Sequence, residues 1–73
     1  MQRYNRIRIV LAEKDLRNNF LAQRLDVNDA TVSRWCSNAA QPRLPMLYRI
    51  ADALEVDVRD LLLPNAGRPK EDQ

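Results

Sequence analysis

The side chains that can do chemistry in this 73-residue chain are mainly arginines. The sequence has no histidine, its single cysteine is Cys36, and it shows no serine nucleophile arrangement and no carboxylate pair with a pocket to hold it. A lone cysteine without histidine does not supply a usual zinc site. Ten of the twelve cationic residues are arginine, whose planar guanidinium donates paired hydrogen bonds to phosphates and guanine edges. We therefore expect a binding protein rather than an enzyme, without metal or cofactor.

Charge is distributed unevenly along the chain. The net charge is +2, but residues 1–49 carry nine basic and four acidic side chains, a net charge of +5. Residues 50–73 carry three basic and six acidic side chains, a net charge of −3. The basic segment favours a nucleic-acid partner, although a solvated surface followed by an acidic tail would have the same charge pattern.

Length and composition limit the architecture to one small domain. Hydrophobic residues make up 45% of the chain and charged residues 30%, which is typical of globular proteins. One cysteine excludes an intramolecular disulfide framework, so a reducing compartment is expected. The longest apolar run near the N-terminus, residues 9–12, is too short for a signal peptide or a membrane span. These features predict a cytoplasmic protein without membrane contact.

Hydrophobic spacing of about 3.6 residues predicts an all-α domain with five helices. Asn28 is a suitable N-cap for the third helix, and Pro45 fits the first turn of the fourth. Residues 37–43 have no apolar period and are expected to form a loop. The polar residues after Pro64 predict a disordered tail, so the domain is placed at 1–63 and the tail at 64–73. The predicted helices cover about residues 5–14, 18–25, 28–36, 45–55 and 57–62.

Residues 17–36 combine two short helices with a very short connection. The connection contains Asp26, which tolerates the left-handed backbone conformation that ends many helices. A turn this short requires a steep crossing, for which Ala22 and Val32 provide small and branched side chains. The second helix then protrudes from the domain and fits a DNA major groove about 12 Å wide.

The sequence Leu-Ala-Gln-Arg-Leu-Asp-Val-Asn-Asp-Ala-Thr-Val-Ser-Arg-Trp at residues 21–35 resembles the helix-turn-helix of the phage Cro/repressor family, also called the XRE family. The resemblance extends over about residues 5–63. It implies a five-helix lambda-repressor-like fold and a transcriptional regulator, with a repressor favoured, that places helix 28–36 in the major groove. Asp26 and Asn38 stand where the family often has glycine. Leu11 and Cys36 replace an Arg–Glu pair of phage repressors, which predicts a buried structural thiol, with redox sensing as an alternative.

Helical geometry and this resemblance together predict the surface that faces DNA. Arg34 is the first choice for direct readout of guanine, with a phosphate contact or an intrahelical ion pair as alternatives. Asp29 either accepts from a cytosine amino group, stabilises the helix start or disfavours other sequences. Arg43 either reaches the DNA backbone or is a solvated loop charge, and Phe20 is expected to support neighbouring helices. The predicted base contacts are Asp29, Ala30, Ser33 and Arg34, and the predicted backbone contacts are Arg17, Asn18, Asn28, Thr31, Ser37, Asn38 and Arg43.

A single domain of this size binds a short DNA site, so a homodimer on a palindromic operator is expected. The C-terminal segment carries more apolar side chains than one short helix needs. The predicted dimer interface contains Leu44, Met46, Val58, Leu61, Leu62 and Leu63. No small-molecule ligand is indicated, and a bacterial or phage protein associated with the nucleoid is expected. The competing hypothesis is a protein-interaction module, such as an antitoxin or a partner of a polymerase or toxin, in which DNA binding is secondary.

Overall fold

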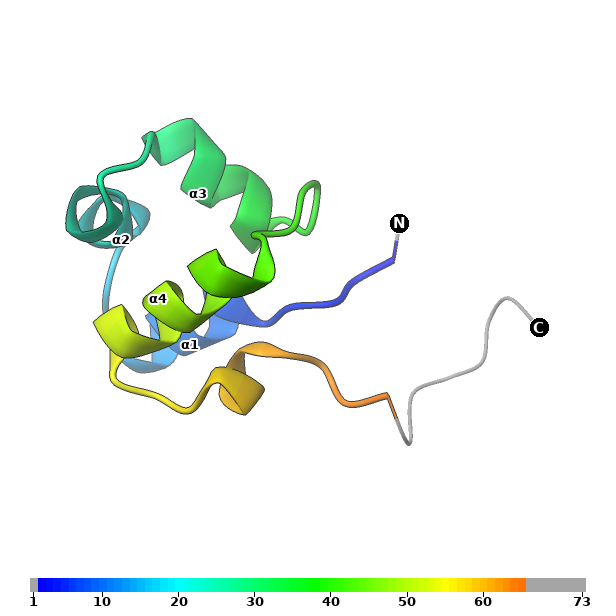
Figure 1. The fold of residues 1–73 in the computed structure, drawn as a ribbon. Coiled ribbons are helices and arrows are strands. Elements are labelled where there is room, and N and C mark those ends of the chain that lie inside the picture. Colours follow the sequence, from blue (N-terminus) through cyan, green and yellow to red (C-terminus); the bar gives the residue numbers. More distant parts are fainter. Residues whose placement is uncertain (1, 66–73) are drawn as a thin grey trace.

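The computed structural model describes residues 2–65 and contains four α-helices and one short 3-10 helix (Figure 1). The described part of the chain has no β-strand and only an isolated antiparallel bridge between Asn5 and Leu62. The predicted all-helical class is confirmed, although there are four α-helices rather than five. Residues 66–73 of the predicted tail lie outside the described residues. The helices are α1 (Ile7–Glu13), α2 (Asn18–Leu25), α3 (Asp29–Cys36), α4 (Leu44–Leu54) and the 3-10 helix η1 (Val58–Leu61).

The predicted final α-helix at residues 57–62 is wrong in type and length. Asp57 caps it as expected, because its Oδ1 accepts from the backbone N–H of Arg59 at 2.8 Å. Leu62, however, is extended (φ −115°, ψ 145°) and pairs with Asn5. The N–H of the following Leu63 donates to the carbonyl of Tyr4 at 2.9 Å. The chain leaves the helix because residues 62 and 63 pair with the N-terminal segment.

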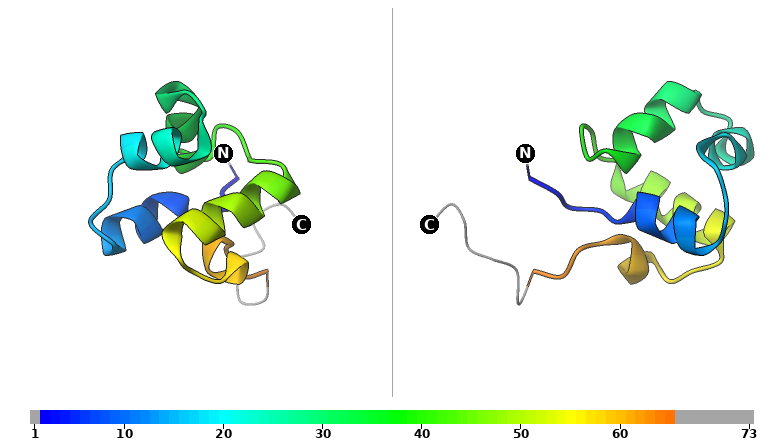
Figure 2. Two further views of the ribbon diagram at one scale, coloured as in Figure 1. Left: turned by 60° about the vertical axis from the view of Figure 1, so that its left-hand side comes forward. Right: turned by 180° about the vertical axis from the view of Figure 1, so that it is seen from behind.

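One hydrophobic core connects all the helices. α2 packs against α3 and α4, α1 packs against α3 and η1, and α4 packs against η1, as the turned views in Figure 2 illustrate. Leu11 and Cys36 are 3% and 6% exposed, so the expected replacement of an ion pair by two apolar side chains is accommodated inside this core. The buried apolar residues are Ile7, Val10, Leu11, Leu21, Ala22, Leu25, Val32, Trp35, Cys36, Leu47, Ile50, Ala51, Leu54 and Leu61.

The first α-helix begins at Ile7, two residues later than predicted, because the side chain of Asn5 forms hydrogen bonds that hold the segment before the helix. Asn5 is 1% exposed, and its side-chain oxygen accepts from the N–H of Ile7 at 3.0 Å. Its Nδ2 donates to the carbonyl of Trp35 at 3.0 Å and to Oε1 of Gln41 at 2.7 Å. The N-terminal segment is therefore fastened to the end of α3.

Candidate nucleic-acid interface

The connection between α2 and α3 has the geometry that the sequence predicts. Asp26 lies in the left-handed region (φ 57°, ψ 48°), and the N–H of Val27 donates to the carbonyl of Ala22 at 2.9 Å. Ala22 and Val32 are 4% and 0% exposed. The left-handed residue reverses the chain within a few residues, and the small Ala22 side chain allows the close crossing. The α2–α3 pair is therefore a helix-turn-helix.

α3 has one buried and one exposed face. Val32, Trp35 and Cys36 are buried, whereas all four predicted base-reading residues, Asp29, Ala30, Ser33 and Arg34, are exposed. Asn28 caps the helix as predicted, since its Oδ1 accepts from the N–H of Ala30 at 2.8 Å. Arg34 has no ion pair within residues 2–65, so its guanidinium is free of the intrahelical pair considered above. The exposed face can thus enter a groove of DNA with its hydrogen-bonding groups available.

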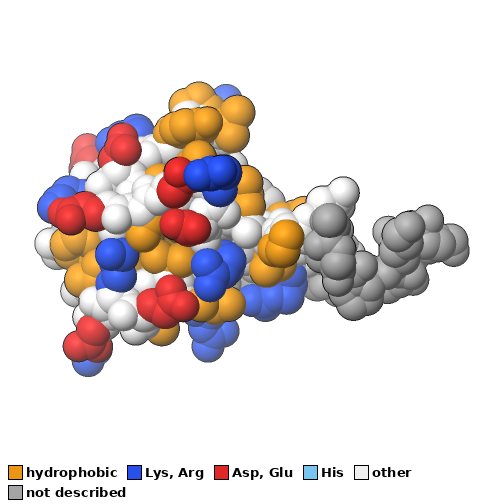
Figure 3. Space-filling view, turned by 90° about the horizontal axis from the view of Figure 1, so that it is seen from below, with side chains coloured by type: hydrophobic (Ala, Val, Ile, Leu, Met, Phe, Trp, Pro, Cys, Tyr) orange, Lys and Arg blue, Asp and Glu red, His pale blue; other side chains and the backbone are white. Residues whose placement is uncertain are grey.

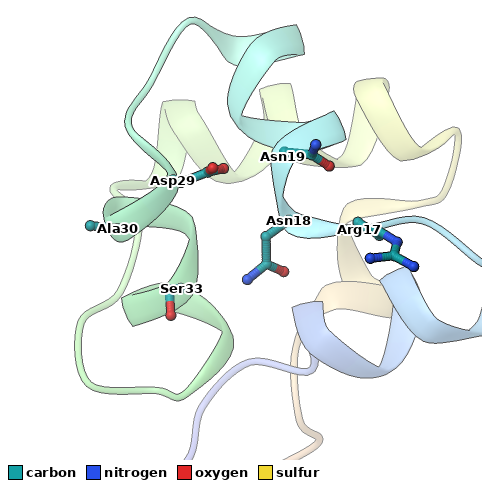
Figure 4. A pocket seen from close by; sticks show the side chains of 6 residues that line it. All are labelled: Arg17, Asn18, Asn19, Asp29, Ala30 and Ser33. Atoms are coloured by element: carbon teal, nitrogen blue, oxygen red, sulfur yellow. The ribbon is translucent and has the colours of Figure 1, made fainter.

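An open groove of about 640 Å³ lies between the start of α2 and the exposed face of α3 (Figure 4). In this view Asn18 points into the space between the two helices, and Asp29 points from α3 toward α2. Ala30 points outward from the other side of α3. The groove is lined by Arg17, Asn18, Asn19, Asp29, Ala30 and Ser33.

Asn18 is held by the last residue of α3. The thiol of Cys36 donates to Oδ1 of Asn18, with 3.5 Å between the two atoms. Burial raises the pKa of the Cys36 thiol above its ordinary value, and the positive charge of Arg8 offsets part of this effect. The thiol therefore stays protonated at neutral pH and acts as a donor. Because Oδ1 of Asn18 accepts this hydrogen bond, its Nδ2 group is the part available to an acceptor on DNA.

The residues predicted to contact the DNA backbone differ in exposure. Arg17, Asn28, Ser37 and Arg43 are exposed, and Asn18 and Thr31 are half-buried. The hydroxyl of Ser37 donates to the carbonyl of Arg34 at 3.2 Å, which uses its hydrogen within the protein.

Asn38 is removed from the predicted backbone contacts, because its side chain is 5% exposed and points into the protein. Its Oδ1 accepts from the N–H groups of Tyr4 (2.8 Å) and Asn5 (3.0 Å), and its Nδ2 donates to the carbonyl of Asn5 at 3.1 Å. Its φ of 64° lies in the left-handed region, which asparagine tolerates better than most residues do. These hydrogen bonds explain why an asparagine serves here, and they leave its side chain unavailable to a phosphate.

Sequence reasoning missed three residues near this surface. Asn19 lines the groove beside Asn18, and its position directly after the helix start was the signal that could have identified it. Arg8 borders a second hollow at the end of α3, and nothing in the local sequence indicates this position. Asn5 supports the end of α3 through the hydrogen bond to Trp35, and a partner 30 residues away gives no sequence signal.

The predicted dimer interface divides into exposed and buried members. Leu44 and Leu62 are 65% and 41% exposed, and Met46, Val58 and Leu63 are half-buried. Leu61 is 0% exposed and belongs to the core, so it is removed from the predicted interface.

Phe20 supports its neighbours as expected: it packs against the core, and the Arg24 guanidinium lies 5.3 Å from its ring centre. Acidic and basic side chains intermingle on the side that carries α1 and η1 (Figure 3).

Comparison with known proteins agrees with this geometry. The family model for the Cro/C1-type HTH DNA-binding domain matches residues 6–66. The chain belongs to the Cro/C1-type helix-turn-helix family. The structure of this Cro/C1-type domain also matches the crystal structure of a protein from Bacteroides fragilis that is described as a putative DNA-binding protein, with a TM-score of 0.80 and 49% sequence identity. The match covers 81% of this chain and 95% of the other chain.

Comparison with curated proteins gives no significant match. None of the helices in residues 2–65 has the length and apolar character needed to cross a membrane. The DNA-binding assignment of this Cro/C1-type domain thus rests on the family match, the structural neighbour and the exposed face of α3.

Proposed function

We propose that the chain is a sequence-specific transcriptional regulator that binds a double-stranded operator, most simply as a repressor. The observation that carries the proposal is the exposure of Asp29, Ala30, Ser33 and Arg34 on one face of α3, opposite its buried face. α3 enters the major groove, and Arg34 donates two hydrogen bonds to O6 and N7 of a guanine. Ala30 contacts a thymine methyl group, and Ser33 donates to or accepts from a base edge.

Residues beside α3 set its register on the duplex. The Nδ2 group of Asn18 and the guanidinium of Arg17 bind phosphates at the start of α2, and Arg43 reaches the backbone from the loop after α3. The free N–H groups in the first turn of α2 favour an anion at the same place. These contacts position α3 but do not select a sequence.

The regulator acts as a homodimer on a palindrome, in the cytoplasm of a bacterium or in a cell that a phage infects. One general argument and one observation support a dimer: a single module covers too few base pairs for high specificity, and Leu44 and Leu62 expose apolar surface. Met46, Val58 and Leu63 are half-buried and complete the proposed interface.

The test is selection of bound duplexes from a random DNA pool, followed by affinity measurements. We expect a palindromic consensus that is bound more tightly than unrelated DNA. Arg34→Ala should weaken binding to the consensus by about 1–3 kcal/mol and relax the preference at one base pair per half-site. Asn18→Ala should weaken binding to every duplex. Failure to enrich any sequence, or unchanged binding by both variants, contradicts the proposal and favours a protein-interaction module.

A further inference from the structure

A second hollow continues the DNA-facing groove toward α1. It has a volume of about 290 Å³ and shares Asn18 and Ser33 with the larger groove between α2 and α3. The exposed surface therefore runs without interruption from the start of α3 to the first helix. The residues that line the second hollow are Arg8, Asn18, Ser33, Cys36 and Ser37.

The two hollows differ in their charge. The groove between α2 and α3 is lined by one acidic residue, Asp29, and one basic residue, Arg17. The hollow at α1 is lined by one arginine, Arg8, and by no acidic residue. An anion in this hollow meets a positive charge and no carboxylate among the lining residues, so the α1 side of the surface favours a phosphate more than the α3 side does.

The guanidinium of Arg8 has no bonding partner among residues 2–65. Its side chain is exposed, and within residues 2–65 it makes no hydrogen bond or ion pair. Arg6 differs, because it donates to the carbonyl of Asp60 at 2.8 Å and pairs with Glu13 at 3.6 Å. Arg59 also differs, because it pairs with Asp57 at 3.0 Å. Arg8 lines the same hollow as Cys36 and Ser37, which places it beside the last turn of α3.

We infer that Arg8 binds a DNA backbone phosphate, so that α1 forms a third helical contact with the duplex. The phosphate lies over the hollow at α1 and receives hydrogen bonds from the Arg8 guanidinium and from Nδ2 of Asn18. The thiol of Cys36 already donates to Oδ1 of Asn18 at 3.5 Å, which turns the amide donor toward the anion. This contact rests on the proposed DNA-binding function and adds to it a specific phosphate ligand outside the helix-turn-helix.

The experiment compares Arg8→Ala with Arg59→Ala, which removes the same charge from a residue that lines neither hollow. Arg59 belongs to η1, which lies below α1 and α4 in Figure 1, away from α2 and α3. Dissociation constants are measured from 50 to 200 mM salt, for the selected operator and for an unrelated duplex. Each neutralised phosphate contributes a slope of about 0.9 to the plot of log affinity against log salt.

We expect Arg8→Ala to reduce this slope by about 0.9, so that its affinity falls about 3.5-fold less than that of the wild type over the fourfold increase in salt. The loss should be the same for the operator and the unrelated duplex, because a phosphate contact carries no sequence information. Arg8→Lys should keep the wild-type slope, and Arg59→Ala should change it little. A slope for Arg8→Ala equal to that of Arg59→Ala overturns the inference.

Two further readouts separate this inference from other effects. Arg8 is exposed, so the melting temperature of Arg8→Ala should match that of the wild type. If Arg8→Ala unfolds more easily than the wild type, the salt slopes of Arg8→Gln and Arg8→Lys are compared instead. Only Arg8→Lys retains the charge, so only Arg8→Gln should reduce the slope. A wild-type protein that binds no duplex contradicts the proposed function, whereas a wild-type protein that binds DNA with a slope insensitive to Arg8 contradicts only the contact from α1.

Discussion

The thiol of Cys36 donates a hydrogen bond to the side-chain oxygen of Asn18, with 3.5 Å between Sγ and Oδ1. The bond joins the last residue of α3 to the first residue of α2, so it connects the two helices of the helix-turn-helix at their outer ends. It also fixes which part of the Asn18 amide faces outward. A cysteine in the core thereby orients a residue of the DNA-facing surface.

Stability should depend on pH through Cys36. Burial raises the pKa of its thiol above the ordinary value of 9.0, so the folded thiol stays protonated at a pH where the unfolded thiol ionises. The unfolded state then binds fewer protons, and the free energy of unfolding falls as pH rises through 9. Urea denaturation between pH 7 and pH 9.5 should show a steeper decrease for the wild type than for Cys36→Ala. Parallel curves for the two proteins would contradict this prediction.

Two glycine substitutions at left-handed residues should have opposite effects. Asn38→Gly introduces a residue that adopts φ 64° without steric cost, but it removes the Asn38 acceptor from the buried N–H of Asn5 and the partly buried N–H of Tyr4. We expect a loss of about 1–3 kcal/mol in the free energy of unfolding. Glu55→Gly at φ 58° relieves the steric cost of a left-handed side chain at an exposed position and should gain about 1 kcal/mol.

Asp52→Gly, in the last turn of α4, is the control for these two variants. It is exposed and helical, so it should lose about 0.5–1 kcal/mol through backbone entropy alone. Thermal and urea denaturation measure all three changes. A stabilising Asn38→Gly would show that the hydrogen bonds of Asn38 contribute less than the strain of its backbone.

Base reading and phosphate binding should be separable by mutation. Arg34→Ala should change the consensus at one position, because its two hydrogen bonds to guanine discriminate by about 1–3 kcal/mol. Arg17→Ala should lower affinity for all duplexes by a similar factor and leave the consensus unchanged. Selection of bound duplexes from a random DNA pool with each variant gives the consensus sequence that the variant prefers. An Arg34→Ala protein with the wild-type consensus would assign Arg34 to the phosphate backbone.

Two adjacent leucines, Leu61 and Leu62, should affect different properties, namely folding stability and dimerisation. Leu61 is 0% exposed, so Leu61→Ala should cost about 2–5 kcal/mol of unfolding free energy by leaving a cavity. Leu62 is 41% exposed, so Leu62→Asp should have a smaller effect on folding and should weaken the proposed dimer. Sedimentation of both variants, with and without operator DNA, measures the second effect. A wild-type protein that stays monomeric on DNA at high micromolar concentration would rule out the dimer.

The sequence by itself determined the local features of this protein. Hydrophobic spacing identified four α-helices within a few residues of their ends, because each of them buries one face in the same core. The left-handed residues Asp26 and Asn38 and the cap Asn28 were also predictable, since their conformations depend on neighbouring residues. The exposed residues of α3 followed from helical geometry once its buried face was known.

Only the tertiary structure decided which distant residues meet. The side chain of Asn38 turns inward because Tyr4 and Asn5, more than 30 residues earlier, present N–H groups to it. The predicted fifth helix ends as a single 3-10 turn because Leu62 pairs with Asn5, 57 residues earlier in the chain. The hollow that joins Arg8 to Asn18 exists because α1 packs beside the end of α3. Hydrogen bonds and packing between distant segments leave no periodic signal along the chain, so the folded structure alone reveals them.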